Sequence, residues 1–185
     1  GTKFLIKPNK HIVFKRKVSA EGTKELPIIF KKNQKGDKPW GTVAIIGKGS
    51  KESILDNVIF QGGSGGNLNQ YKFLSMLSIH NSSDIKLSNS KFSFNELFDD
   101  TIHIIYSSNI LLKNIEIKNA YSDAIDIDIS SNVILKNVKI KDSKNDGVDF
   151  MESKAIIENL EVVNSQDKGV SIGENSDVII KNSIF

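Results

Sequence analysis

The strongest constraint on the fold of this chain is an internal repeat of about 23 residues. In every unit an asparagine ends an apolar segment, and successive asparagines are 32, 25, 23, 22 and 23 residues apart. A Leu or Ile stands two positions before each of them, and an Ile, Val or Phe stands three positions after. Units of this length predict a chain in which one small structural element stacks on the next.

Each repeat reads as a series of short strands. Apolar residues alternate with polar ones in "IDID", "NVILKN" and "VKIK", and turn-forming Ser, Asn, Asp and Gly separate these runs. A unit of 22–23 residues leaves no room for a crossover helix. We therefore predict an all-β, right-handed parallel β-helix with three short strands per coil, in which each strand pairs with its equivalent one coil away.

The repeated asparagines have a structural explanation. Asparagine tolerates the left-handed conformation that a tight bend between two strands requires. Stacked asparagine side chains can also hydrogen-bond along the axis, which predicts an asparagine ladder. A row of asparagines that binds a ligand is the alternative. The predicted ladder comprises Asn57, Asn89, Asn114, Asn137, Asn159 and Asn182.

The 185 residues are enough for one domain with one core. Residues 1–41 fit the repeat poorly and predict irregular N-terminal coils, whereas residues 42–185 predict regular coils. The wide first interval contains an inserted loop, "GGSGGNLNQYKFLS" at 62–75, which is either functional or a surface insertion. Because the chain begins at Gly1 and ends at Phe185 within a strand pattern, we expect a fragment of a longer protein with further domains.

Composition excludes some functions. The 25 basic residues nearly balance the 22 acidic ones, and no basic stripe stands out, so we expect no nucleic-acid partner. No stretch approaches 18 consecutive apolar residues, so we expect no membrane insertion. Because the chain has no cysteine, cysteine usage gives no information on whether the protein resides in an oxidising or a reducing compartment.

Acidic residues recur at equivalent positions of the first strand and of the turn before it. Asp126 and Asp149 are the second residues of their strands, so they should point outward from neighbouring coils. Asp123 and Asp146 should stack in the same way at the turn. Carboxylates about 5 Å apart cost on the order of 1–3 kcal/mol at an effective dielectric constant of 20–80. Core packing does not explain such a row, so another interaction must offset this cost.

Three explanations are open. A calcium ion could bind the carboxylates of Asp123, Asp126, Asp146 and Asp149, since calcium prefers oxygen ligands. A shared proton could raise one pKa and create a general acid. In the third explanation each turn aspartate caps backbone N–H groups of its own turn, and Lys168 neutralises the end of the row.

The repeat, the asparagine bend and the acidic face resemble the pectate-lyase-like superfamily of right-handed β-helices. This resemblance implies a polysaccharide groove along one strand column and the turn leading into it. Calcium-dependent lyases of the group use such carboxylates for the metal, with an Arg or Lys base. The only arginine here is Arg16, far from the acidic row, so the resemblance would assign the base to Lys168. "NDGVD" at 145–149 is similar to the aspartate stretch of polygalacturonase-like hydrolases.

A closer resemblance is to the β-helix domains that accompany CotH-type, spore-coat-H-like secreted bacterial proteins. "SDAIDID" (122–128), "NDGVDF" (145–150) and "DKGVSIGENS" (167–176) look like successive coil motifs of those domains. This resemblance implies a bacterial, secreted or cell-surface module, with no reaction assigned to the β-helix itself.

Two main hypotheses about function follow. The first is a module that binds carbohydrate or another anionic polymer, with Asp100, Asp128, Tyr71 and Phe73 as substrate-binding candidates. The second is a polysaccharide lyase or glycoside hydrolase, with catalytic candidates Asp126, Asp149, Lys168 and His103. A spacer or self-assembly segment is a third reading. The only cofactor expected is Ca²⁺, or none.

Overall fold

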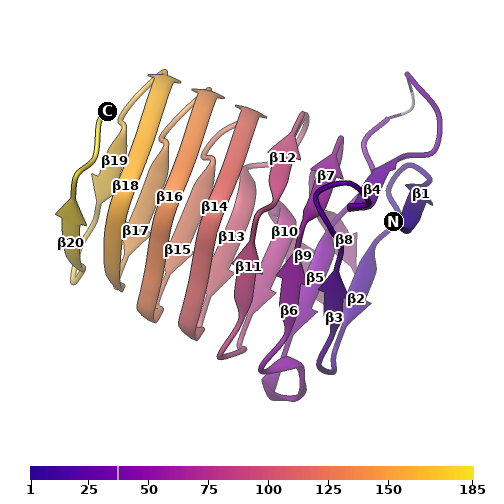
Figure 1. The fold of residues 1–185 in the computed structure, drawn as a ribbon, viewed down its shortest axis with the longest axis horizontal. Coiled ribbons are helices and arrows are strands. Elements are labelled where there is room, and N and C mark those ends of the chain that lie inside the picture. Colours follow the sequence, from indigo (N-terminus) through magenta and orange to yellow (C-terminus); the bar gives the residue numbers. More distant parts are fainter. Residues whose placement is uncertain (37) are drawn as a thin grey trace.

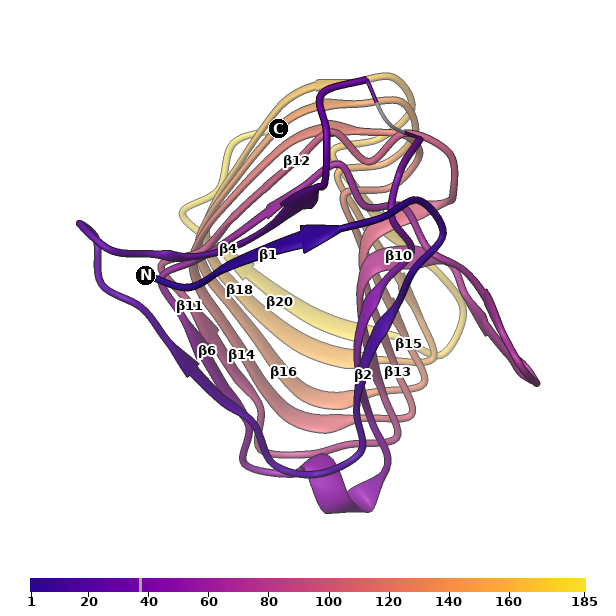
Figure 2. The same cartoon turned by 90° about the vertical axis from the view of Figure 1, so that its right-hand side faces the viewer.

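The computed structural model describes residues 1–36 and 38–185, whose coils stack along one axis (Figure 1). A seven-stranded sheet takes one strand from each turn, and an eleven-stranded sheet forms the rest of the wall (Figure 2). The strands of both sheets pair in parallel with their equivalents in neighbouring coils. The predicted all-β, right-handed parallel β-helix is confirmed. Within the described ranges, no helix is long and apolar enough to cross a membrane.

The seven-stranded sheet carries the first strand of each coil. Its members are β2 (Ile12–Phe14), β5 (Val43–Ile46), β10 (Ser75–His80), β13 (Asp100–Ile105), β15 (Ile125–Asp128), β17 (Val148–Met151) and β19 (Val170–Ile172). In β15 and β17 alternate side chains are buried: Ile125 and Ile127 are fully buried, whereas Asp126 and Asp128 are not. β5, β10 and β13 are buried on both faces over most of their length.

The eleven-stranded sheet carries the second and third runs of each coil. Its members are β1 (Lys3–Ile6), β3 (Ser19–Glu21), β4 (Ile28–Lys32), β6 (Ile54–Asp56), β7 (Val58–Gln61), β11 (Lys86–Ser88), β12 (Lys91–Ser93), β14 (Ser108–Ala120), β16 (Ser131–Ser143), β18 (Lys154–Ser165) and β20 (Asp177–Lys181). In β14, β16 and β18 the two runs merge into one long strand that bends at its asparagine.

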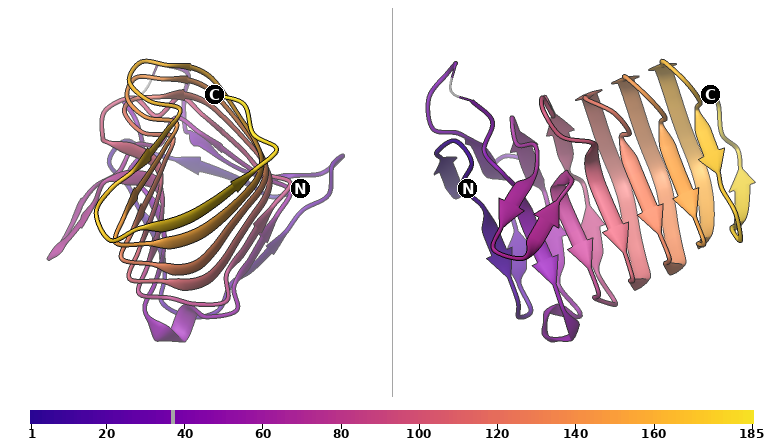
Figure 3. Two further views of the ribbon diagram at one scale, coloured as in Figure 1. Left: turned by 90° about the vertical axis from the view of Figure 1, so that its left-hand side faces the viewer. Right: turned by 180° about the vertical axis from the view of Figure 1, so that it is seen from behind.

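The N-terminal region and the predicted loop are more regular than expected. β1 to β4 pair in register with later strands, so residues 1–41 largely join the β-helix. The 3-10 helix η1 (Lys48–Ser50) follows β5. The insertion at 62–75 contains an antiparallel hairpin of β8 (Gly66–Leu68) and β9 (Tyr71–Phe73). This hairpin projects from the side of the coils (Figure 3).

The core is built from columns of equivalent apolar side chains. Ile102, Ile125 and Val148 form one fully buried column on neighbouring strands of the seven-stranded sheet. A second column is aromatic: the Phe60 ring stacks on Phe30 at 5.0 Å and on Phe92 at 4.6 Å between centroids. Because each coil contacts only its neighbours, such columns hold the coils in register.

The asparagine bend occurs at all six predicted positions, and Asn89, Asn114, Asn137 and Asn159 form a hydrogen-bonded ladder. All six predicted asparagines have φ between 48° and 58°, the left-handed conformation. The Nδ2 group of Asn114 donates to Oδ1 of Asn89 at 2.8 Å, and the Asn137 and Asn159 amides continue this pattern at 2.9 Å each. At the start of the ladder Asn89 donates to Asp56 rather than to Asn57.

A buried serine column, which the repeat analysis missed, supports the turn after the seven-stranded sheet. The hydroxyl of Ser107 accepts the backbone N–H of Ser82, the hydroxyl of Ser130 accepts that of Ser107, and Ser153 accepts that of Ser130. These bonds satisfy turn amides that the strand ladder leaves free.

We expect Asn137→Ala to lower the free energy of unfolding by about 1–3 kcal/mol, measured by urea denaturation. Alanine at φ 54° pays the left-handed penalty and removes two ladder hydrogen bonds. Asn137→Gly keeps the backbone conformation and loses only the hydrogen bonds, so it should cost less. Equal losses for the two variants would show that the left-handed backbone contributes little.

Candidate functional site

The loop between β12 and β13 places the first acidic residues of the site. The Asn95 amide donates to the carbonyls of Phe98 and Asp100, at 2.9 and 2.7 Å. Its Oδ1 accepts the Ser64 hydroxyl at 2.8 Å, and the same hydroxyl oxygen accepts two backbone N–H groups of the loop. The loop is thereby tied to the segment just before the β8–β9 hairpin, and Asp100 is only 2% exposed.

The predicted stacking of acidic residues occurs on the outer face of the seven-stranded sheet. Asp126 pairs in register with His103 on β13 and with Asp149 on β17. Ser171 continues this row on β19. We call the outward row His103, Asp126 and Asp149, together with Asp128 beside it, the acidic strip.

On the eleven-stranded sheet, some side chains of opposite charge lie opposite each other on neighbouring strands. There Lys136 lies opposite Glu158 and Lys139 opposite Glu161, with 2.7 Å between the charged atoms of each pair. Opposite charges on neighbouring strands stabilise a sheet and like charges destabilise it. The eleven-stranded sheet also has lysines opposite each other, Lys113 with Lys136 and Lys118 with Lys141, so Asp126 and Asp149 are the acidic counterpart of such pairs on the seven-stranded sheet.

Four side chains from β13 and β15 form what we call the Asp–His cluster: Asp100, His103, Asp126 and Asp128. Nε2 of His103 lies 3.4 Å from Oδ2 of Asp128 and 3.6 Å from Oδ2 of Asp126. Ligand-capable atoms of Asp100, His103 and Asp126 all lie within 4.8 Å of one another. His103 is 5% exposed, so it is not an ordinary surface histidine.

Burial and mutual repulsion raise the pKa values of the carboxyl groups. Burial, followed by the charge of Asp126, raises the pKa of Asp100 to about 10. Burial also raises the pKa of Asp126 to about 7, although His103 opposes the shift. The pKa of the neighbouring Asp123 rises to about 6, again chiefly through burial.

The turn aspartates accept backbone N–H groups of the next coil, rather than those of their own turn as expected. Oδ1 of Asp123 accepts the backbone N–H of Asp146 at 2.7 Å, and Oδ1 of Asp146 accepts that of Lys168 at 2.8 Å. The Lys168 ammonium lies 3.8 Å from Asp146 and pairs with Asp167. The hydrogen bond to Asp167 raises the pKa of Lys168, which disfavours it as a base at neutral pH.

The four carboxylates expected to bind calcium do not gather in one place. Among the described residues, the acidic or histidine groups close enough to share an ion are Asp100, His103 and Asp126, and also Asp99, Asp100 and Asp123. Asp146 and Asp149 belong to neither group. Both groups lie around Asp100, one coil nearer the N-terminus than the sequence indicated.

The two aromatic candidates of the hairpin differ in exposure. Phe73 is 1% exposed and packs on Ala44 and Ile46, so this conformation leaves no ring face for a ligand. Tyr71 is 37% exposed, stacks on Phe73 at 5.8 Å and lies under the Lys15 ammonium. Asp100, expected to bind substrate, is likewise buried because the loop after β12 covers it.

A groove missed by sequence reasoning runs beside the turns that lead into the seven-stranded sheet. One depression of about 560 Å³ is lined by Asp99, Tyr121, Lys144 and Gln166, among others. Lys144 and Gln166 also line a second depression of about 540 Å³, so the two adjoin. The Lys144 ammonium lies 4.9 Å from the centre of the Tyr121 ring.

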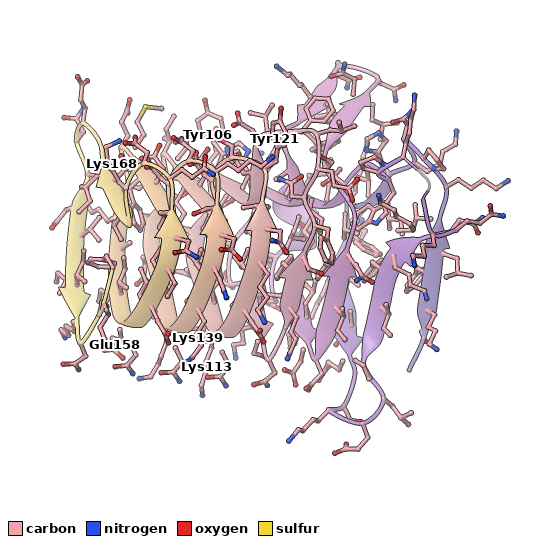
Figure 4. All side chains as sticks on the ribbon, turned by 90° about the horizontal axis from the view of Figure 1, so that it is seen from above. Tyr106, Lys113, Tyr121, Lys139, Glu158 and Lys168 are labelled. Atoms are coloured by element: carbon pink, nitrogen blue, oxygen red, sulfur yellow. The ribbon has the colours of Figure 1, made fainter. Side chains whose placement is uncertain are left out.

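Two exposed tyrosines lie at opposite ends of the strands of the seven-stranded sheet: Tyr121 lines the groove before β15, and Tyr106 follows β13 outside it. Tyr121 is 42% exposed and Tyr106 is 60% exposed. Figure 4 shows both on the same edge as Lys168, opposite the edge that carries Lys139 and Glu158. In the sequence, each of these tyrosines lies just outside a predicted strand. The sequence analysis compared only positions that recur from coil to coil, so it missed them.

The geometry defines a right-handed β-helix with an acidic outer face and an adjoining groove. Residues 75–185, more than half of the chain, match the family described as "Right handed beta helix region", so the chain belongs to this family. A search of curated proteins found no match.

Solved structures share the fold at low sequence identity. The catalytic domain of an α-1,3-glucanase of glycoside hydrolase family 87, in complex with nigerose, matches with a TM-score of 0.68 and 14% identity over 98% of this chain and 33% of that one. A candidate glycosyl hydrolase from Parabacteroides merdae matches with a TM-score of 0.61 and 9% identity over 85% of this chain and 80% of that one. A periplasmic alginate epimerase matches with a TM-score of 0.54 and 16% identity over 96% of this chain and 46% of that one.

Proposed function

We propose that the chain is a polysaccharide-binding β-helix module whose ligand lies along the acidic strip and the adjoining groove. The observation that carries this proposal is the row of outward carboxyl groups beside the groove. Asp126 and Asp149 stack on neighbouring strands, and no lysine or arginine forms an ion pair with either of them in the described part of the chain. An outward row of carboxyl groups without such partners is a candidate for binding.

The groove supplies what a sugar chain requires. Its two adjoining depressions form an elongated surface beside the turns of successive coils. The exposed Tyr121 ring offers an apolar face for a sugar ring, and Asp99 and Lys144 offer an acceptor and a donor for hydroxyl groups. A few polar groups around an aromatic surface are the usual composition of a ligand site.

Charge decides between neutral and anionic polymers. Hydroxyl groups of a neutral polysaccharide can donate hydrogen bonds to the acidic strip directly. A uronic-acid polymer would be repelled by it unless a cation bridges the two. A Ca²⁺ ion on Asp123, Asp126, Asp146 and Asp149 is the form of that bridge proposed from the sequence.

The comparisons support a carbohydrate ligand and an extracellular or cell-envelope location. The matched structures include an α-1,3-glucanase with a bound sugar and a periplasmic alginate epimerase. The chain spans about a third of the glucanase catalytic domain. The proposed parent is a secreted bacterial protein of the CotH-associated kind, with other domains in the same chain.

A glycoside hydrolase or polysaccharide lyase is the second candidate. The observation that favours it is the proximity of the Asp100 and Asp126 carboxyl groups, which lie in one cluster with His103. Two neighbouring carboxyl groups are the usual catalytic equipment of a glycosidase. The lyase form is weaker, because Lys168 is paired with Asp167 and held protonated.

The proposal is tested by affinity electrophoresis in gels containing α-1,3-glucan, alginate or homogalacturonan, with and without Ca²⁺. We expect at least one polymer to retain the protein. Tyr121→Ala should weaken retention roughly 3- to 10-fold, while Tyr121→Phe keeps the ring and the retention. Lys139→Ala, on the opposite edge, is the matched control and should have no effect.

Assays for new reducing ends and for unsaturated products separate the two candidates. Retention without products supports the binding module. Release of products that is lost in an Asp126→Asn, Asp149→Asn double variant would establish the enzyme instead. If no polymer retains the protein and none is cleaved by it, the carbohydrate proposal is overturned.

A further inference from the structure

Unsatisfied polar atoms are concentrated at the Asp–His cluster. Across the described residues, the buried side-chain nitrogen and oxygen atoms without a hydrogen-bond partner are Asp100 Oδ2, Thr101 Oγ1, His103 Nδ1 and His80 Nε2. Three belong to one short segment of β13, and the His80 ring lies edge-on to His103 at 5.0 Å. Native proteins satisfy nearly all such atoms, so a group of them requires a ligand or another explanation.

Asp100 is the cluster member whose charge would be the most costly to bury. Its side chain is almost fully buried, and its carboxyl group lies within 4.8 Å of ligand-capable atoms of both His103 and Asp126. No lysine or arginine forms an ion pair with it in the described part of the chain. Ionising this buried carboxyl group is unfavourable without a nearby positive charge, which a bound metal ion would supply.

The spacing around His103 fits a metal ion better than a hydrogen bond. Nε2 of His103 lies 3.4 Å from Asp128 Oδ2 and 3.6 Å from Asp126 Oδ2, longer than good hydrogen bonds of about 2.7–3.2 Å. In a tetrahedral zinc site with bonds of about 2.0–2.2 Å, neighbouring ligand atoms are about 3.3–3.6 Å apart. Both distances from the imidazole to a carboxylate therefore match those of ligands that share an ion, and Asp100 lies within 4.8 Å of His103 and Asp126.

We infer that Asp100, His103 and Asp126, with Asp128 beside them, bind a divalent transition metal such as Zn²⁺. An imidazole nitrogen combined with carboxylates suits zinc and related metals, whereas calcium takes oxygen ligands alone. The site lies one coil nearer the N-terminus than the calcium row proposed from the sequence. His103, Asp126 and Asp128 also belong to the acidic strip of the proposed function, but the metal site is argued from the buried atoms around Asp100 and requires no polysaccharide.

Isothermal titration calorimetry on the full chain, first stripped of metal by a chelator, tests the site with ZnCl₂ and CaCl₂ separately. We expect one zinc ion per chain, confirmed by elemental analysis of the dialysed complex, and tighter binding of Zn²⁺ than of Ca²⁺. Asp100→Asn and His103→Gln should each weaken zinc binding on the order of 100-fold. Asp149→Asn, a carboxylate of the same strip outside the cluster, should change it by less than about threefold.

Circular dichroism of each metal-free variant shows whether it is folded before it is titrated, and His103→Gln and Asp100→Asn test the site independently. Zinc bound as tightly by both variants as by the wild type would overturn the inference, as would the absence of one-to-one zinc binding. Binding of Ca²⁺ alone, lost in Asp149→Asn, would also overturn it and return the metal to the row proposed from the sequence. Polymer retention is measured in a separate assay, so failure of one proposal does not affect the other.

Discussion

In metal-free protein, Asp100→Asn raises the free energy of unfolding by about 1–3 kcal/mol at pH 7. Asp100 is 2% exposed, its Oδ2 has no partner, and Asp126 and Asp123 add negative charge nearby. Asparagine has nearly the same shape and no charge, so it removes the cost of burying the carboxyl group. Urea denaturation in the presence of a chelator measures the difference.

The pH dependence has a defined direction. Because the pKa of Asp100 rises to about 10 in the folded protein, the folded state holds a proton that the unfolded chain releases near its ordinary value of 3.8. Wild-type stability therefore falls as pH rises between these two values. The advantage of Asp100→Asn should be small at pH 4 and should grow steadily toward pH 9.

Asp149→Asn is the matched control for this prediction. Asp149 lies in the same strip, but it is partly exposed and its Oδ1 accepts the backbone N–H of Phe150 at 2.9 Å. Its substitution should change stability by less than about 1 kcal/mol, with little dependence on pH. If Asp100→Asn were less stable than the wild type at pH 7, the Asp100 carboxylate would have a favourable partner in metal-free protein.

Phe60→Ala should lower the free energy of unfolding by about 3–5 kcal/mol. Phe60 is fully buried in the middle of the aromatic column, stacked on Phe30 and Phe92. Its loss leaves a cavity between coils that the parallel strands on either side prevent from closing. Thermal and urea denaturation followed by circular dichroism give the change.

Phe4→Ala tests whether position in the column decides the cost. Phe4 stacks on Phe30 at 4.6 Å, but it is 38% exposed at the end of the same column. It should cost about 1–2 kcal/mol, since its removal leaves an open notch rather than a cavity. Similar losses for the two variants would mean that unfolding begins elsewhere and that the column is not continuous in solution.

The repeat alone was enough to predict the coil and its register. In a solenoid each residue has its equivalent directly above and below it, so the spacing along the chain specifies these neighbours. The asparagine ladder and the pairing of Asp126 with Asp149 follow from that spacing. Other columns of φ-positive residues were missed: Tyr106 and Ile129, in the column of Asn81, adopt φ of 52° and 44° because the coils around them impose the bend.

The burial of residues around the site depends on contacts with segments that are not part of the repeat. The hairpin inserted at 62–75 covers the outer face at Phe73, and the loop tied by Asn95 to Ser64 encloses Asp100. Both segments occur once, so counting from coil to coil does not reveal which outward side chains they cover. Stacking is a local, repeated property that residue spacing encodes, whereas the environment of Asp100 and His103 depends on unique segments that meet only when the chain is folded.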